Sequence, residues 1–314
     1  MNYTDYFSYG QTFIALEGAI SEKGFNKARF RPKRIILGGI NAYSGNTLVR
    51  GLLDNHPSIL MISNFNLFDN NLFWICVQLA DVPMEKILPL FKSMYQPEDL
   101  SICKIEAFEE KLEELLEVGE RYTSQELFVI FMIAYVYMYG REIDDVRDML
   151  IYWEPHNSGD LREKFLGWLG MEEGLCGIIN VVRNTCMKNG SMIRGDFGQV
   201  EMETLLVHSL VYSKIHQVNQ GGFERVVVRF EDLKLNPREK LSELCKYWGI
   251  LWSETLMKTT EYGKRAGYGD GHQKIYDFDL KPVYNNYEEY FSSFDRFRFT
   301  LICSPWQKNM TTPM

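Results

Sequence analysis

Residues 34–57 read RIILGGINAYSGNTLVRGLLDNHP, and this stretch decides the fold that we expect. It begins with a short apolar run, passes through glycines and small polar residues, and ends in a segment with leucines at helical spacing. This order predicts a strand, a loop and a helix. Gly45 lets the backbone approach a ligand closely. The amides of Gly45, Asn46 and Thr47 would lie at the start of the helix, where an anion such as a phosphate is favoured.

The loop differs from the usual ATP and GTP loop, GxxxxGK[ST], in which the lysine reaches the outer phosphates. Gly39 and Gly45 are separated by five residues rather than four, and Asn46 stands at the lysine position. We also find no carboxylate placed to hold magnesium. Ordinary kinase activity therefore ranks third, well behind the two functions described below.

Composition limits the class of protein. The chain has 314 residues, of which 46% are hydrophobic, so it can bury one large core or two modest ones. Its net charge of −8 argues against a nucleic-acid binder, which normally shows a basic face. The longest apolar run, 127–139, is shorter than the roughly 20 residues that span a bilayer, so a buried helix is expected there. The six cysteines form no CxxC pair, which predicts no zinc site, no disulfide framework and a cytoplasmic protein.

Further strand signals follow the loop, and helical patterns separate them. They lie at 57–63, 149–153, 177–182 and 225–230. Continuous apolar strands that alternate with helices predict a three-layer α/β/α fold with a central parallel sheet. We expect one domain over residues 1–314, with a helical insertion at about 70–140 and a C-terminal loop and tail at about 260–314.

Ligands of such sheets bind beyond the carboxyl ends of the strands. Four segments that follow strands are therefore expected around one crevice. They are 43–47, 154–157, 183–191 and 230–232.

The loop resembles the 5′-phosphosulfate loop of the sulfotransferases that use 3′-phosphoadenosine 5′-phosphosulfate (PAPS). Their pattern is a strand, Gly-x-x-Arg/Lys-Ser-Gly-Thr-Thr-Leu, a helix and often Asp-x-His-Pro. The matching residues are Ser44, Gly45, Thr47, Leu48, Asp54, His56 and Pro57. Tyr43 stands where the family has a basic residue, and Asn46 replaces the first threonine. We expect His56 to be structural, capping or packing at the end of the first helix.

Three further segments are similar to the family. Arg183 and Ser191 have the separation of the arginine and serine that grip the 3′-phosphate. Phe230 stands where the family often has a tyrosine against adenine, and Lys264 and Arg265 fall in the register of a glycine-rich loop that closes over the 3′-phosphate. Without the resemblance, Arg183 could form a structural ion pair, and the lysine and arginine could belong to a mobile surface loop.

The resemblance implies a P-loop-like sulfotransferase fold and transfer of a sulfuryl group from PAPS, without a metal, to a hydroxyl or amine of a carbohydrate or small-molecule acceptor. His156 is the first candidate for the general base and Glu154 the second, because a histidine suits proton abstraction at neutral pH. Tyr43 could donate a hydrogen bond where the family has a cation. The alternative is a catalytically impaired relative that binds the product, adenosine 3′,5′-bisphosphate (PAP), or another nucleotide.

Overall fold

The computed structural model describes residues 25–38, 44–61, 75–94, 102–143, 145–153, 175–194, 201–217, 224–267, 275–284 and 290–307. The chain divides into two compact units, and each is described by itself. The first unit takes Met1–Lys33, Phe65–Arg147 and Ser158–Glu172, and the second takes Arg34–Asn64, Asp148–Asn157 and Glu173–Met314. The stretch expected as a helical insertion, about 70–140, falls in the first unit.

The second unit is built on a parallel sheet of five strands in the order β2-β3-β1-β4-β5. The strands are β1 (Arg34–Gly38), β2 (Ile59–Met61), β3 (Leu150–Trp153), β4 (Cys176–Val182) and β5 (Glu224–Arg229). In the register of the central strand, Leu37 pairs with Trp153 of β3 and with Ile178 of β4. Together with the helices that flank it, this sheet confirms the predicted α/β fold with a central parallel sheet.

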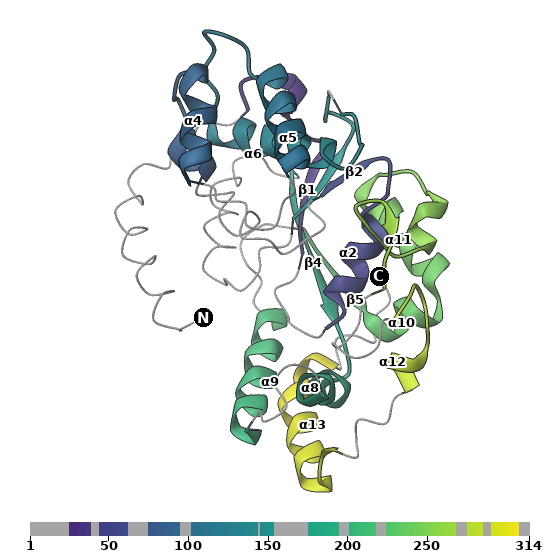
Figure 1. The fold of residues 1–314 in the computed structure, drawn as a ribbon. Coiled ribbons are helices and arrows are strands. Elements are labelled where there is room, and N and C mark those ends of the chain that lie inside the picture. The colour runs from purple at the N-terminus through teal and green to yellow at the C-terminus, as the bar shows by residue number, and fades with distance from the viewer. Residues whose placement is uncertain are drawn as a thin grey trace. The chain divides into compact units, whose positions relative to one another are not determined.

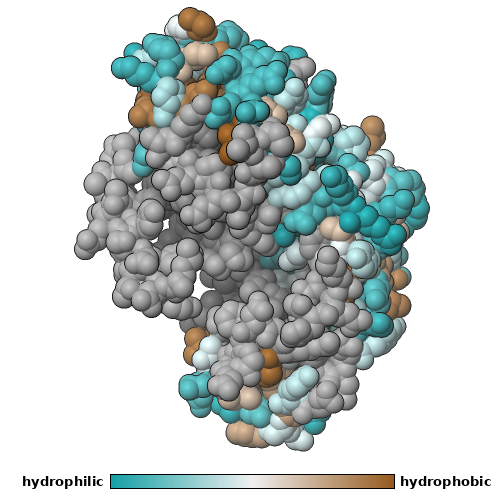
Figure 2. All heavy atoms as spheres, viewed as in Figure 1, coloured by the Kyte–Doolittle hydropathy of each residue, from teal (hydrophilic) through white to brown (hydrophobic). Residues whose placement is uncertain are grey.

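The central strands are apolar in a continuous run because the residues on both of their faces are buried. Leu37 and Ile151 point to one face and Ile36 and Tyr152 to the other, and each is at most 1% exposed. On the second face, helices α2 (Asn46–Leu53) and α11 (Pro237–Trp248) contribute to one core, and Figure 1 shows them on the same side of the strands. Figure 2 shows that the outer surface over α11 is mostly hydrophilic.

Three helices form a smaller core near the carboxyl ends of β4 and β5 (Figure 1). They are α8 (Thr185–Arg194), α9 (Met202–Gln217) and α13 (Ser293–Gln307). Their buried contacts join Met192, Leu205 and Phe299 of the helices with Phe291, which precedes α13. The rings of Phe291 and Phe299 meet edge to face at 5.1 Å. This core fixes α8, which carries one of the predicted site residues.

The remaining elements of this unit are short and lie C-terminal to β5. They are α10 (Phe230–Leu235), η2 (Glu254–Met257), β6 (Thr260–Glu261), β7 (Lys264–Arg265) and α12 (Lys281–Tyr284). Helix α11 begins with Pro237 in its first turn, where proline is favoured, and ends at Gly249, which adopts the left-handed conformation of a helix C-cap.

The first unit is helical in the described residues. It contains η1 (Ala28–Phe30), α4 (Met84–Met94), α5 (Ile102–Leu115) and α6 (Ser124–Tyr137). Every residue of α6 from 124 to 136 is buried, which confirms the predicted buried helix. Thr123 and Glu126 form a capping box at its start. Among the described helices, none has the length and apolar character needed to cross a membrane.

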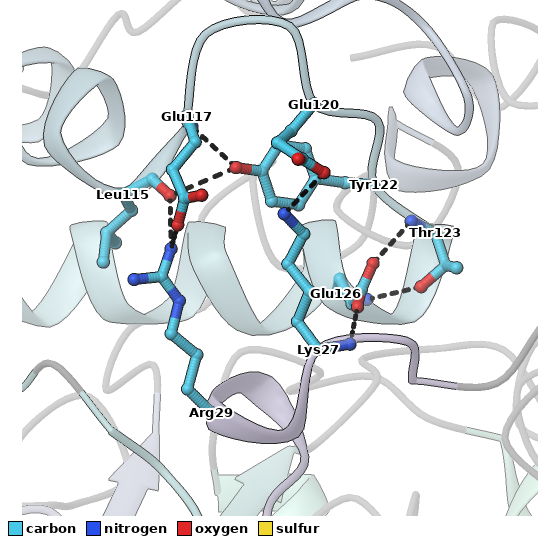
Figure 3. A network of polar contacts seen from close by, with 8 residues as sticks. All are labelled: Lys27, Arg29, Leu115, Glu117, Glu120, Tyr122, Thr123 and Glu126. Atoms are coloured by element: carbon cyan, nitrogen blue, oxygen red, sulfur yellow. Dashed lines mark hydrogen bonds and ion pairs between the residues drawn. The ribbon is translucent and has the colours of Figure 1, made fainter.

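A polar network ties the segment around η1 to the turn between α5 and α6 (Figure 3). The Nζ atom of Lys27 lies 3.0 Å from Glu120, and Nη2 of Arg29 lies 2.6 Å from Glu117. The backbone N–H of Glu117 donates to the hydroxyl of Tyr122, whose side chain is buried. Exposed ion pairs stabilise little by themselves, so the buried tyrosine is what anchors this network.

Candidate functional site

The predicted phosphate loop leads into the first turn of α2. Gly45 is the N-cap residue and has a φ of +109°, which suits glycine and few other residues. The N–H groups of Leu48 and Val49 donate to the Gly45 carbonyl at 3.0 and 3.2 Å. The N-cap residue is a glycine and has no side chain that could cap this end of the helix. The N–H groups and the partial positive charge at a helix start favour an anion.

The glycine packs directly against an aromatic ring. A Cβ atom placed on Gly45 would lie 2.4 Å from Cδ2 of Phe230, closer than real contacts allow. Phe230 is the first residue of α10 and follows β5 without a break. The close approach therefore depends on glycine and joins the loop after β1 to the end of β5.

Arg183 and Ser191, the predicted 3′-phosphate pair, lie next to each other. Nη1 of Arg183 donates to Oγ of Ser191 at 3.0 Å, and both residues are buried. Arg183 follows the end of β4, and Ser191 lies in α8. The side chain of Asn184 accepts from the N–H groups of Cys186 and Met187 and so fixes the start of α8. The separation in the sequence thus brings the two groups together because strand, cap and helix follow in direct succession.

Phe230 is also the neighbour of Arg183. The guanidinium carbon of Arg183 lies 4.6 Å from the centroid of the Phe230 ring. One ring therefore contacts Gly45 at the start of α2 and Arg183 at the end of β4. The two predicted anion-binding groups share one aromatic neighbour within the same unit.

Lys234 belongs to this cluster and was missed by the sequence analysis. It follows Phe230 by one helical turn in α10 and is only 3% exposed. Its Nζ atom lies 5.8 Å from the ring centroid of Phe230 and donates to the carbonyl of Asp277 at 2.6 Å. Burial lowers the pKa of Lys234 to about 8; the charge of Asp279 opposes this effect and that of Arg183 adds to it. The signal that could have revealed it is its position on the buried side of α10, beside Phe230 and Leu233.

Lys264 and Arg265 lie in a hairpin rather than in a loop. Strand β7 pairs with β6 in antiparallel fashion, and Tyr262 and Gly263 at the turn both have positive φ. Both cationic side chains are exposed, and Nη2 of Arg265 lies 3.0 Å from Asp277. Their contact with a phosphate stays a prediction.

Four residues singled out in the sequence remain, and the structure describes one of them, His56. His56 is buried; its Nδ1 accepts from the Ser58 N–H at 3.1 Å, so Nε2 carries the proton and donates to the Leu251 carbonyl at 3.0 Å. These contacts agree with the structural role expected for His56. The three candidate catalytic residues, Tyr43, Glu154 and His156, lie outside the described residues. In the described part of the chain, no three metal-ligating side chains group together.

Comparisons with known proteins connect this fold to sulfotransferase domains. No protein-family model matches the chain, and no curated protein matches it. The sulfotransferase domain from the curacin biosynthetic pathway is similar at a TM-score of 0.50 and 16% identity, over 87% of this chain and 98% of that one. The sulfotransferase domain of the Synechococcus PCC 7002 olefin synthase gives 0.44 and 16%, over 91% and 98%. A sulfotransferase of Mycobacterium avium gives 0.39 and 8%, over 97% and 82%.

The first of these similarities shows that the chain has a sulfotransferase-like fold. At this level of identity the similarity concerns the fold alone. The chemistry must be argued from the residues of the site.

Proposed function

We propose that the chain transfers a sulfuryl group from PAPS to a hydroxyl or amine of a carbohydrate or small-molecule acceptor. One observation carries the proposal: the start of α2 and the Arg183–Ser191 pair are neighbours of the same Phe230 ring. A nucleotide with a phosphate at each end of its ribose needs two anion-binding groups at such close range. The sulfotransferase-like fold supports the same conclusion.

The described residues fit the two ends of this co-substrate. The start of α2, residues Ser44, Gly45, Asn46, Thr47 and Leu48, would hold the 5′-phosphosulfate through backbone amides and the macrodipole of the helix. Arg183 would hold the 3′-phosphate through its planar fork of donors, with Ser191 as a third donor. Phe230 would support adenine, and Lys264 and Arg265 would approach from the hairpin. Four described cysteines are free thiols, which supports a reducing compartment such as the cytoplasm.

In the proposed reaction, the acceptor oxygen or nitrogen forms a bond to sulfur while the bond from sulfur to the bridging oxygen of PAPS breaks. His156, or Glu154 in its place, takes the proton of the acceptor. Negative charge develops on the bridging oxygen, and the amides at the start of α2 and the hydroxyl of Tyr43 stabilise it. The products are the sulfated acceptor and PAP.

Binding of the nucleotide tests the proposal directly. We expect PAP to raise the melting temperature of the purified chain, since a ligand selective for the folded state stabilises it by about 2.7 kcal/mol at 100 times its Kd. ATP and GTP, measured in parallel, should give smaller shifts. Absence of a shift at millimolar PAP would remove the proposal.

Tyr43 separates an active enzyme from a catalytically impaired relative that binds PAP or another nucleotide. If the tyrosine hydroxyl acts as the donor, Tyr43→Phe should lower the rate of transfer from PAPS roughly 10²- to 10³-fold. Tyr43→Lys should then keep the rate within about tenfold of the original, because the lysine restores the donor of the family pattern. Radiolabelled transfer to a panel of acceptors measures both variants. An inactive original chain that becomes active only as Tyr43→Lys would favour the impaired relative.

A further inference from the structure

Lys234 is a buried cation whose described partner is neutral. Its side chain is 3% exposed, and its hydrogen bond goes to a backbone carbonyl, that of Asp277. Among the described residues, no carboxylate oxygen lies within ion-pair distance of its ammonium group. Burying a charge in this way is costly unless an opposite charge compensates it. A bound anion would compensate the buried charge of Lys234.

Arg183 lies against the same ring and donates two hydrogen bonds to neutral groups. Its Nη1 donates to the Ser191 hydroxyl and its Nη2 to the carbonyl of Pro282, at 3.0 and 2.9 Å. The guanidinium and the ammonium group are 4.6 and 5.8 Å from the centroid of the Phe230 ring. Two buried cations thus neighbour the same ring, the charge of one acts on the other, and the Ser191 hydroxyl is bonded to Arg183.

The two acidic groups whose charges act on Lys234 form hydrogen bonds with other residues. The carboxylate of Asp277 accepts from the Thr259 N–H at 2.7 Å and from Arg265 at 3.0 Å. The carboxylate of Asp279 accepts from the Lys281 N–H at 2.9 Å. Their charges act on Lys234 only through space, as does the charge of Arg183. They reduce the excess positive charge without binding the ammonium group.

We propose that Lys234 is a second cationic ligand, beside Arg183, for the terminal phosphate of the nucleotide, and that the two cations select a phosphomonoester dianion at this position. The inference rests on the proposed function, because it concerns the 3′-phosphate end of the same site. A monoester carries close to two negative charges and three acceptor oxygens at neutral pH, which matches two cations and a hydroxyl group. A ribose hydroxyl at the same place would bring no negative charge to the ammonium group of Lys234, whose described hydrogen-bond acceptor is a neutral carbonyl.

The competing role for Lys234 is structural. The hydrogen bond to the Asp277 carbonyl could serve only to hold the 275–284 segment, which also receives the bond from Arg183 to Pro282. The two roles predict opposite effects of Lys234→Met on the ligand-free protein. A structural bond would be lost, and the melting temperature would fall. An uncompensated buried charge would instead be replaced by an apolar side chain of similar size, and the melting temperature would stay or rise.

The experiment compares Lys234→Met with the original chain in two measurements, the melting temperature without ligand and the Kd values of PAP and adenosine 5′-phosphate by calorimetry. We expect PAP to bind about 10- to 100-fold more weakly to the variant, the loss typical of one charged hydrogen bond. The affinity for adenosine 5′-phosphate, which lacks the second phosphate, should not change. Lys246→Gln, which removes an exposed lysine of α11, is the matched control and should change neither affinity.

The pH dependence gives a second readout. Because the pKa of Lys234 is about 8 in the ligand-free protein, its ammonium group loses its proton above that pH. PAP affinity should therefore fall as the pH rises through 8 in the original chain, and this fall should be absent in Lys234→Met. The phosphate itself stays a dianion over this range, since its second pKa is near 6.

The outcomes separate this inference from the proposed function. If the original chain binds PAP and Lys234→Met binds it equally well, Lys234 is no ligand although the proposed function stands. The inference would also be overturned if Lys234→Met bound PAP and adenosine 5′-phosphate more weakly by the same factor. A lower melting temperature of this variant with an unchanged ratio of the two affinities would likewise favour the structural role. If the original chain binds neither nucleotide, the proposed function fails and the inference fails with it.

Discussion

Gly45→Ala is expected to lower the melting temperature sharply and to abolish stabilisation by PAP. The φ of +109° at Gly45 disfavours any residue with a Cβ, at a cost of roughly 1–2 kcal/mol. The Cβ would also lie 2.4 Å from the Phe230 ring, and overpacking of this kind costs about 1–3 kcal/mol. Together these approach the lower end of the total stability of a domain, about 5 kcal/mol. Displacement of the ring or of the loop would also move the start of α2 away from the Phe230 ring, which Arg183 contacts as well.

Gly119→Ala is the matched control for the backbone contribution. Gly119 has a φ of +82°, but nothing lies within 4 Å of the position that its Cβ would take. Its substitution should cost only the conformational part, and PAP should still stabilise the variant. Thermal unfolding of the two variants side by side measures the difference. Equal destabilisation by both would show that the ring does not press on Gly45.

The clash can also be isolated by a double substitution. Phe230→Ala removes the ring atoms nearest to Gly45, so adding Gly45→Ala to it should cost less than adding Gly45→Ala to the original chain. A coupling energy of about 0.5–3 kcal/mol is expected for two residues in direct contact. Strictly additive effects would contradict the contact.

The fold could be predicted from the sequence because its main signals are local. Strands buried on both faces appear as continuous apolar runs, and residues 34–38 and 176–182 show this pattern. The apolar run inside α6 predicts a wholly buried helix in the same way. The strand order could not be predicted from the sequence. Strand β1 pairs with β3 and β4, and no local pattern records which distant strands become neighbours.

The candidate site follows the same rule. The separation of Arg183 and Ser191 could be used because a strand, a cap and a helix succeed one another without interruption. Spacing within one segment could not reveal the role of Lys234, since its hydrogen-bond acceptor, the Asp277 carbonyl, lies 43 residues further along the chain. The hairpin at Lys264 could not be predicted because its two strands have only two residues each, too few to show an alternating pattern.

Arg183→Ala is expected to remove most of the stabilisation by PAP. Truncating one partner of a buried charged pair commonly costs about 2–5 kcal/mol of binding free energy. The affinity for PAP should therefore fall by roughly 30-fold or more. Without ligand the variant should lose little stability. Ser191 and Pro282 lose a hydrogen-bond donor, but Lys234 is relieved of the neighbouring positive charge that lowers its pKa. The ligand-free melting temperature and the PAP-dependent shift, measured together, separate these effects.

Arg229→Ala is the matched control for this substitution. Arg229 ends β5, its backbone pairs with Val182 next to Arg183, and its side chain is 47% exposed. It carries the same charge at the same end of the sheet, but its partner is Asp232. If long-range attraction between the protein and the nucleotide's charges accounted for binding, both substitutions would lower the affinity for PAP equally. Added salt would then reduce the difference in affinity between each variant and the original chain. A buried fork of donors in direct contact with the phosphate predicts a loss confined to Arg183→Ala and only weakly dependent on salt, because salt screens a buried pair of charges much less than an exposed one.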